Sequence, residues 1–178
     1  MRLNPRRPVH VDCALTVAAA PQRVIIDAGP LIAWFDAADA HHAAVKALLN
    51  SYRGELLSTW PVLTEVCHLL PDSVVPGFLR WVGHGGLTLV DVPAPTSLVL
   101  ADRMDKYADL PMDLADASLI WLAETTGVLD VLTIDRRDFG IYRTARGKAL
   151  RNLLDSLPRP SSSKPPKPRT PRPARPTR

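Results

Sequence analysis

The sequence predicts an α/β fold, a three-layer α/β/α sandwich with a central parallel sheet. Short apolar runs alternate along the chain with longer segments that have the spacing of helices. The apolar runs are continuous, which is typical of strands that are buried on both faces. A hydrophobic fraction of 46% over 178 residues is enough for one sizeable core.

The first predicted elements are two strands that enclose two helices. Residues 24–26 are β-branched and form a strand, and residues 30–35 form a short helix with Pro30 at a tolerated early position. Apolar residues at helical spacing predict a helix over 40–52. A short strand follows at 55–58.

The middle of the chain adds two helices and a strand. Thr59 is expected to cap a helix that begins at Trp60-Pro61. A further helix is predicted over 72–82, where a group of glycines ends it, and a strand over 87–90.

The last part of the domain repeats the alternation. Helices are predicted over 96–107 and 113–125, and Gly127 ends the second of them. Residues 130–134 form the last clear strand, and a weaker strand is expected after Ala149. Several short strands separated by helices predict parallel pairing.

Charge and proline content divide the chain into three parts. Residues 158–178 hold eight prolines, seven Lys or Arg and no acidic residue, which predicts a disordered tail. For this tail we expect solubility or no role, with a nonspecific attraction to RNA as the alternative. Residues 1–22 are expected to be a loosely ordered leader. The domain between them, 23–157, is acidic, so it is no simple polyanion binder, and contact with nucleic acid must come from local patches or bound metal ions.

Cysteine content and hydropathy indicate the compartment. Cys13 and Cys67 are the only cysteines, so neither a disulfide framework nor a cysteine-based zinc site is expected. The apolar stretch 15–20 is too short for a signal-peptide core, and no run reaches the length of about 20 residues that spans a bilayer. We expect a cytoplasmic protein without a membrane segment.

Four acidic residues stand inside or directly after apolar runs: Asp27, Glu65, Asp116 and Asp135. Apolar segments are a costly place for charge, and a hard divalent cation is the simplest compensation. Strand-end residues of a parallel sheet meet in the crevice where ligands bind. The alternative is structural: Asp27 caps a helix, Asp135 starts a turn, and Glu65 and Asp116 lie exposed on amphipathic helices.

These acids belong to four short motifs in a fixed order. An apolar strand ends in Asp27-Ala28-Gly29-Pro30-Leu31, and the later motifs are Thr64-Glu65-Val66, Met112-Asp113-Leu114-Ala115-Asp116-Ala117 and Leu132-Thr133-Ile134-Asp135-Arg136-Arg137-Asp138-Phe139. The set resembles the PIN-domain ribonucleases, especially the VapC-like toxins of type II toxin–antitoxin systems, over residues 23–150.

The resemblance implies a function and a site. Asp27, Glu65, Asp116 and Asp135 would hold Mg²⁺, or Mn²⁺ as a substitute, for RNA cleavage. Asp113 would be a further direct or water-mediated ligand, and Asp138 and Thr133 would support the site.

The same chemistry follows from the carboxylates themselves. Closely spaced carboxylates raise one another's pKa values and stay ionised only when cations screen them. Mg²⁺ prefers oxygen ligands and commonly binds substrate phosphates as well. A bound metal can activate water for attack on phosphorus. The expected reaction is Mg²⁺-dependent endonucleolytic hydrolysis of phosphodiester bonds, and the resemblance implies that the substrate is RNA.

Basic residues directly after the last motif are candidates for RNA contacts. Six of them fall within residues 136–151, and Arg136 and Arg137 are preferred because they stand nearest the acids. The alternative for each is a solvated surface or a contact with a partner.

The expected partners are RNA, a cognate antitoxin and a second copy of the chain. The homodimer is implied by the resemblance, with exposed apolar stripes on helices 40–52 and 73–82. Two rival functions remain. One is a catalytically silent module that binds RNA or protein. The other is an α/β phosphatase with Asp27 as nucleophile, which lacks the expected second acid because Ala28 and Gly29 follow.

Overall fold

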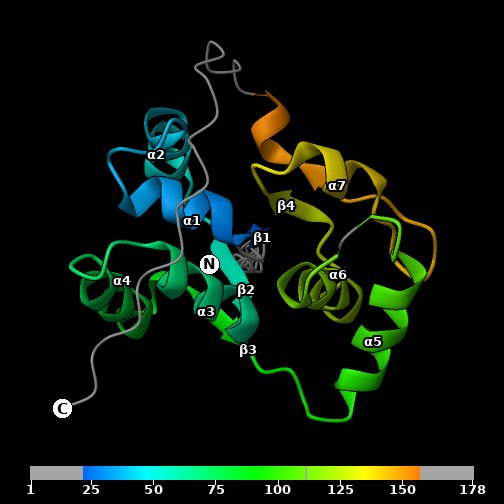
Figure 1. The fold of residues 1–178 in the computed structure, drawn as a ribbon. Helices are drawn as coiled ribbons and strands as arrows, with labels where there is room; N and C mark the ends of the chain where they lie inside the picture. Colours follow the sequence, from blue (N-terminus) through cyan, green and yellow to red (C-terminus); the bar gives the residue numbers. More distant parts are fainter. Residues whose placement is uncertain (1–21, 111, 157–178) are drawn as a thin grey trace, which may run out of the picture.

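A five-stranded, fully parallel sheet forms the centre of the computed structural model, which describes residues 22–110 and 112–156 (Figure 1). The strand order is β3-β2-β1-β4-β5. The strands are β1 (Arg23–Ile26), β2 (Glu55–Thr59), β3 (Thr88–Val90), β4 (Asp130–Leu132) and β5 (Arg151–Asn152). The predicted strands, including the weak one after Ala149, are thus confirmed, whereas the predicted leader and tail lie outside the described residues.

Helices cover both faces of the sheet. Figure 1 shows α1 to α4 on one side and α5 and α6 on the other, which confirms the three-layer α/β/α architecture. The helices are α1 (Ala28–Phe35), α2 (His42–Ser51), α3 (Trp60–Leu69), α4 (Val75–Trp81), α5 (Thr96–Lys106), α6 (Leu114–Thr126) and α7 (Arg136–Ile141), with a π-helical turn η1 (Val82–Gly86) and a 3₁₀ turn η2 (Leu153–Ser156).

The core lies on both sides of β1. Val24, Ile25 and Ile26 are fully buried, as expected for a continuous apolar strand in the middle of a parallel sheet. On the α6 side, Leu119 and Ile120 are also fully buried. The helix ends at Gly127, whose φ of 72° is the left-handed conformation that favours glycine. The packing of α6 against the core therefore fixes where the first turn of this helix lies relative to the sheet.

Three local predictions differ from the structure. The strand predicted over 130–134 ends at Leu132, and the short helix α7 that follows was not predicted. Thr59 stands at the N-cap position of α3, but its hydroxyl pairs with the buried Ser118 hydroxyl at 2.6 Å and makes no cap bond. The helix predicted over 72–82 begins at Val75, because Val74 N–H and Val75 N–H both donate to the Pro71 carbonyl in a preceding turn.

The predicted apolar stripes are mostly used inside the molecule. On α2, Val45 and Leu49 are buried, so this helix does not offer the expected exposed stripe. On α4, Phe78 is buried and Leu79 is exposed. Among the described residues, no helix has the length and hydrophobicity needed to cross a membrane.

Candidate active site

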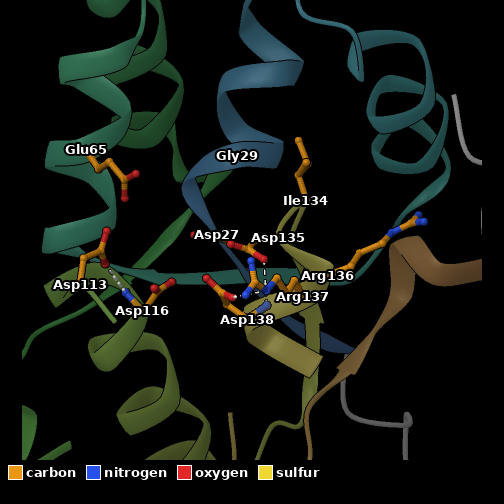
Figure 2. Close-up of a pocket in the computed structure, with 10 residues that line it drawn as sticks. All are labelled: Asp27, Gly29, Glu65, Asp113, Asp116, Ile134, Asp135, Arg136, Arg137 and Asp138. Carbon is orange, nitrogen blue, oxygen red and sulfur yellow. Dashed lines mark hydrogen bonds and ion pairs between the residues drawn. The ribbon is translucent and has the colours of Figure 1, made fainter. Parts of the chain in front are cut away.

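All six acidic residues of the predicted site line one pocket, beyond the carboxyl ends of β1 and β4. Figure 2 shows their side chains arriving from α3, from the start of α6, from the end of β1 and from the segment after β4. We call this the acidic pocket; its lining residues are Asp27, Gly29, Glu65, Asp113, Asp116, Ile134, Asp135, Arg136, Arg137 and Asp138.

Asp27 lies deepest in the acidic pocket and is 9% exposed. It follows β1 and caps α1, because its Oδ1 accepts a hydrogen bond of 2.7 Å from Ala28 N–H. Its Oδ2 accepts a bond of 2.8 Å from the Thr133 hydroxyl. Burial raises the pKa of Asp27 to about 6, an effect that these two hydrogen bonds oppose and the charges of Asp113 and Asp135 reinforce. Asp27 therefore both caps α1, as the structural alternative predicted, and lines the pocket.

Glu65 and Asp116 face the pocket from the two helical layers. Glu65 lies in the middle of α3, and Asp116 lies in the first turn of α6. Burial raises the pKa of each carboxyl group to about 7, and the nearby charges of Asp113 and Asp27 add to the shift. Both side chains are only partly exposed. The alternative of two freely solvated helix residues is therefore wrong.

The start of α6 is held by its own cap and by a buried tyrosine. Asp113 precedes the helix, and its Oδ1 accepts a hydrogen bond of 2.9 Å from Asp116 N–H. The Tyr142 hydroxyl donates to Asp116 Oδ2 over 3.3 Å. Tyr142 is fully buried and packs edge-on against Tyr107 and Phe139, so its hydroxyl has a fixed position. These contacts fix both the backbone and the carboxylate of Asp116.

The segment after β4 carries the remaining acids. The Thr133 hydroxyl accepts a bond of 3.0 Å from Asp135 N–H while it donates to Asp27. Asp135 caps α7 by accepting a bond of 2.9 Å from Asp138 N–H. The pKa of Asp138 is raised by burial and by the neighbouring charge of Asp135. Thr133 thus connects two of the predicted ligands, although it does not itself line the pocket.

The two predicted RNA contacts differ in their surroundings. Arg136 forms an ion pair of 3.1 Å with Asp155 and donates a bond of 2.7 Å to the Leu154 carbonyl, so its guanidinium is already engaged. Arg137 is 84% exposed, and its Nε lies 4.0 Å from Asp138 Oδ1. The other four basic residues of the predicted cluster do not line the pocket; they are Arg143, Arg146, Lys148 and Arg151. Arg137 is therefore the better placed cation for a phosphate.

The donor set suits a hard divalent cation. Carboxylate oxygens dominate the polar lining, with no His or Cys among the lining residues. Burial, and to a lesser degree the charges of neighbouring carboxylates, raise the pKa values of Asp27, Glu65 and Asp116. Within the described residues, however, no three His, Cys, Asp or Glu side chains are close enough to form a ready-made metal site. The acids fit a metal in kind, and some of their side chains must come closer to Asp27 to hold one.

Two residues near the pocket were missed by the sequence analysis. Tyr142 carries no sequence signal, because its contact with Asp116 spans 26 positions. Asn152 stands in the weak strand after Ala149, and its side chain binds the backbone of Thr133. Gly29 lies where a Cβ would come 3.3 Å from Ile134 Cβ, so the first motif needs a small residue where α1 approaches the segment after β4.

Comparisons with known proteins agree with this architecture. Over 128 residues, which cover 70% of this chain and 95% of the relative, the sequence is 32% identical to Ribonuclease VapC26 of Mycobacterium tuberculosis. The fold is similar to the crystal structure of the Mycobacterium tuberculosis toxin VapC20, described as cleaving the sarcin–ricin loop, with a TM-score of 0.61 and 16% identity over 66% of this chain and 93% of that one. No protein-family model matches the chain. The extent and identity of the match to VapC26 show that the chain belongs to the VapC family of PIN-domain ribonucleases.

Proposed function

We propose that this protein is a Mg²⁺-dependent endoribonuclease, the toxin of a toxin–antitoxin pair, and that Asp27, Glu65, Asp116 and Asp135 are its essential carboxylates. One observation carries the proposal. Acids that are up to 108 positions apart in the sequence line a single pocket in a chain of the VapC family. Asp113 contributes a further oxygen ligand, and Mn²⁺ is the expected substitute for Mg²⁺.

Electrostatics explain why a divalent cation is needed. The pocket has six acids against two arginines, and Arg136 is already paired with Asp155. A phosphodiester would therefore be repelled from the pocket as it stands. A Mg²⁺ ion held by these carboxylates would neutralise this charge and would supply an activated water molecule for attack on phosphorus.

The chain's own residues position the reactants. Asp27 is held through both carboxylate oxygens, by Ala28 N–H and by the Thr133 hydroxyl, so its direction is fixed before RNA arrives. Glu65 and Asp116, with pKa values of about 7, hold or release a proton at their carboxyl oxygens near neutral pH. Arg137 contacts an RNA phosphate beside the acids and sets the register of the strand.

The partners follow from the same charges. A cognate antitoxin would inhibit by placing an Arg or Lys among the carboxylates, where it competes with both metal and RNA. We propose that the enzyme meets its RNA substrate in the cytoplasm. A homodimer is also proposed; the exposed Leu79 on α4 and Leu69 at the end of α3 are the apolar side chains it would cover near the predicted 73–82 stripe.

The test is RNA cleavage by the purified protein, freed of antitoxin, with and without Mg²⁺ or Mn²⁺. Asp27→Asn and Asp116→Asn are compared with Asp102→Asn, which neutralises an exposed acid on α5 outside the pocket. We expect metal-dependent cleavage by the wild type and by Asp102→Asn, and at least a 100-fold loss in both pocket variants. Cleavage that survives in a pocket variant removes that residue from the site. Binding of RNA without cleavage under any condition would instead identify a silent binding module.

A further inference from the structure

The pairing between β4 and β5 stops early and is replaced by a side chain. In the ladder, Asp130 is opposite Arg151 and Val131 is opposite Asn152. After Asn152 the chain turns into η2, so no further strand residue faces Thr133. The Asn152 side chain takes this place. Its Nδ2 donates to the Thr133 carbonyl at 2.9 Å, and its Oδ1 accepts from Thr133 N–H at 3.4 Å and from Leu154 N–H at 3.1 Å.

Thr133 is the residue on which the inner part of the pocket depends. Its side chain is fully buried and its hydroxyl has one hydrogen to donate. That hydrogen goes to Asp27 Oδ2 at 2.8 Å, while the same oxygen accepts Asp135 N–H at 3.0 Å. A rotation or shift of the Thr133 backbone would therefore move the contacts of two acids together.

We propose that Asn152 is a positioning residue of the acidic pocket, which acts through Thr133 on Asp27 and Asp135. The amide side chain satisfies both backbone groups of Thr133 and thereby fixes the direction of its hydroxyl. The inference rests on the proposed function, since the property it controls is the binding of a divalent cation by these acids.

The neighbouring residues of the same segment support this role. Directly after Asn152, the Leu154 carbonyl and the Asp155 carboxylate hold the Arg136 guanidinium. The segment 151–156 thus fastens the segment 133–138 at two points, one at each side of Asp135. Residues 134–138 all line the pocket, and Thr133 binds two of its acids.

Removal of the amide has a defined expected effect. In Asn152→Ala the two backbone groups of Thr133 lose their partner, and the hydroxyl no longer has one preferred direction. Residues that orient metal ligands from outside the coordination shell typically change metal affinity or activity by about 10- to 100-fold. A residue that only stabilises the end of β5 would lower the melting temperature and leave metal affinity unchanged.

The experiment measures Mn²⁺ binding by titration calorimetry on EDTA-treated full-length protein without RNA, together with the melting temperature and kcat and KM for RNA cleavage. The variants are Asn152→Ala, Thr133→Val and the double variant. Asn50→Ala is the matched control, because Asn50 is exposed on α2 outside the pocket. We expect Asn152→Ala to weaken Mn²⁺ binding about 10-fold or more and the control to bind like the wild type.

The double variant separates a shared route from an independent one. If Asn152 acts through the Thr133 hydroxyl, adding Asn152→Ala to Thr133→Val changes Mn²⁺ affinity by less than about threefold. The positioning role is refuted if the loss of Mn²⁺ affinity in the double variant equals the product of the two single losses. It is also refuted if Asn152→Ala binds Mn²⁺ as tightly as the wild type, whatever its melting temperature. Should Asn152→Ala fail to fold, Asn152→Ser replaces it and must also weaken binding.

The outcomes also distinguish the two proposals. If the wild type binds Mn²⁺ and cleaves RNA, and Asn152→Ala does both equally well, only the positioning role of Asn152 is refuted. A wild-type protein that binds no Mn²⁺ and cleaves no RNA removes the proposed function and the positioning role together.

Discussion

The substitution Asp27→Asn is expected to stabilise the metal-free protein at neutral and alkaline pH while it abolishes RNA cleavage. Asp27 is nearly fully buried, and burial raises the pKa of its carboxyl group from 3.8 to about 6. The folded protein therefore binds more protons at this site than the unfolded chain between about pH 4 and pH 6. Stability falls as pH rises through this window, and the full cost of the charge is present above it.

The magnitude follows from the shift. A difference of about two pKa units corresponds to about 3 kcal/mol of unfolding free energy above pH 7, at about 1.4 kcal/mol per unit. An asparagine carries no charge, but it can replace only one of the two accepting oxygens that bind Ala28 N–H and the Thr133 hydroxyl. Loss of one such bond offsets about 1 kcal/mol. The variant should gain about 2 kcal/mol at pH 8 and about nothing near pH 4.

Urea denaturation of EDTA-treated wild type and Asp27→Asn at pH 4.5, 5.5, 7 and 8 measures this difference. Asp102→Asn again serves as the control for the loss of one exposed negative charge. Addition of Mg²⁺ at pH 8 should then stabilise the wild type more than the variant, because the cation binds the carboxylate form. An Asp27→Asn variant that is less stable than the wild type at pH 8, or a difference that does not change with pH, would refute the reasoning.

Three further predictions concern the other side chains of the pocket. The affinity of the wild type for Mg²⁺ should rise about tenfold or more from pH 6 to pH 8, because Glu65 and Asp116, with pKa values of about 7, must lose protons to bind it; a flat calorimetric affinity over this range contradicts the assignment. Tyr142→Phe, which keeps the packed ring and removes the bond to Asp116, should raise the pKa of Asp116 and move the pH midpoint of Mg²⁺ binding upward; an unchanged midpoint shows that the 3.3 Å contact has no effect. Arg137→Ala should weaken RNA binding and reduce its salt dependence by about one counterion without a change in melting temperature. Arg136→Ala should instead lower the melting temperature, because it loses the ion pair with Asp155. The reverse pattern would exchange the roles of the two arginines.

The fold and the acids of the pocket were predictable from the sequence because both depend on local patterns. A continuous apolar run such as 24–26 identifies a central strand, and the parallel order places strand-end acids such as Asp27 at one edge. The family motifs added Glu65 and Asp116 on the flanking helices, which strand-end logic alone does not bring to the pocket.

What the sequence could not predict depends on contacts between distant positions. The segment 130–134 has enough β-branched and apolar residues for a longer strand, but pairing with β5 ends at Val131 and pairing with β1 ends at Leu132, so Thr133 and Ile134 have no strand partner. The Thr59 hydroxyl prefers a buried bond with Ser118, 59 positions away, to the local cap. Arg136 was expected to hold RNA because it is near Asp135 in sequence, but a salt bridge to Asp155 turns it toward the end of the domain.

The central position of β1 has a consequence for biosynthesis. This strand pairs on one side with β2, about 30 positions later, and on the other with β4, more than 100 positions later. A chain emerging from the ribosome therefore displays Asp27 and Glu65 well before Asp116 and Asp135 have been translated. A product terminated before residue 130 would contain four of the six acids of the pocket but would lack β4, Asp135 and Asp138. The pocket is therefore completed only when translation of the domain is almost finished.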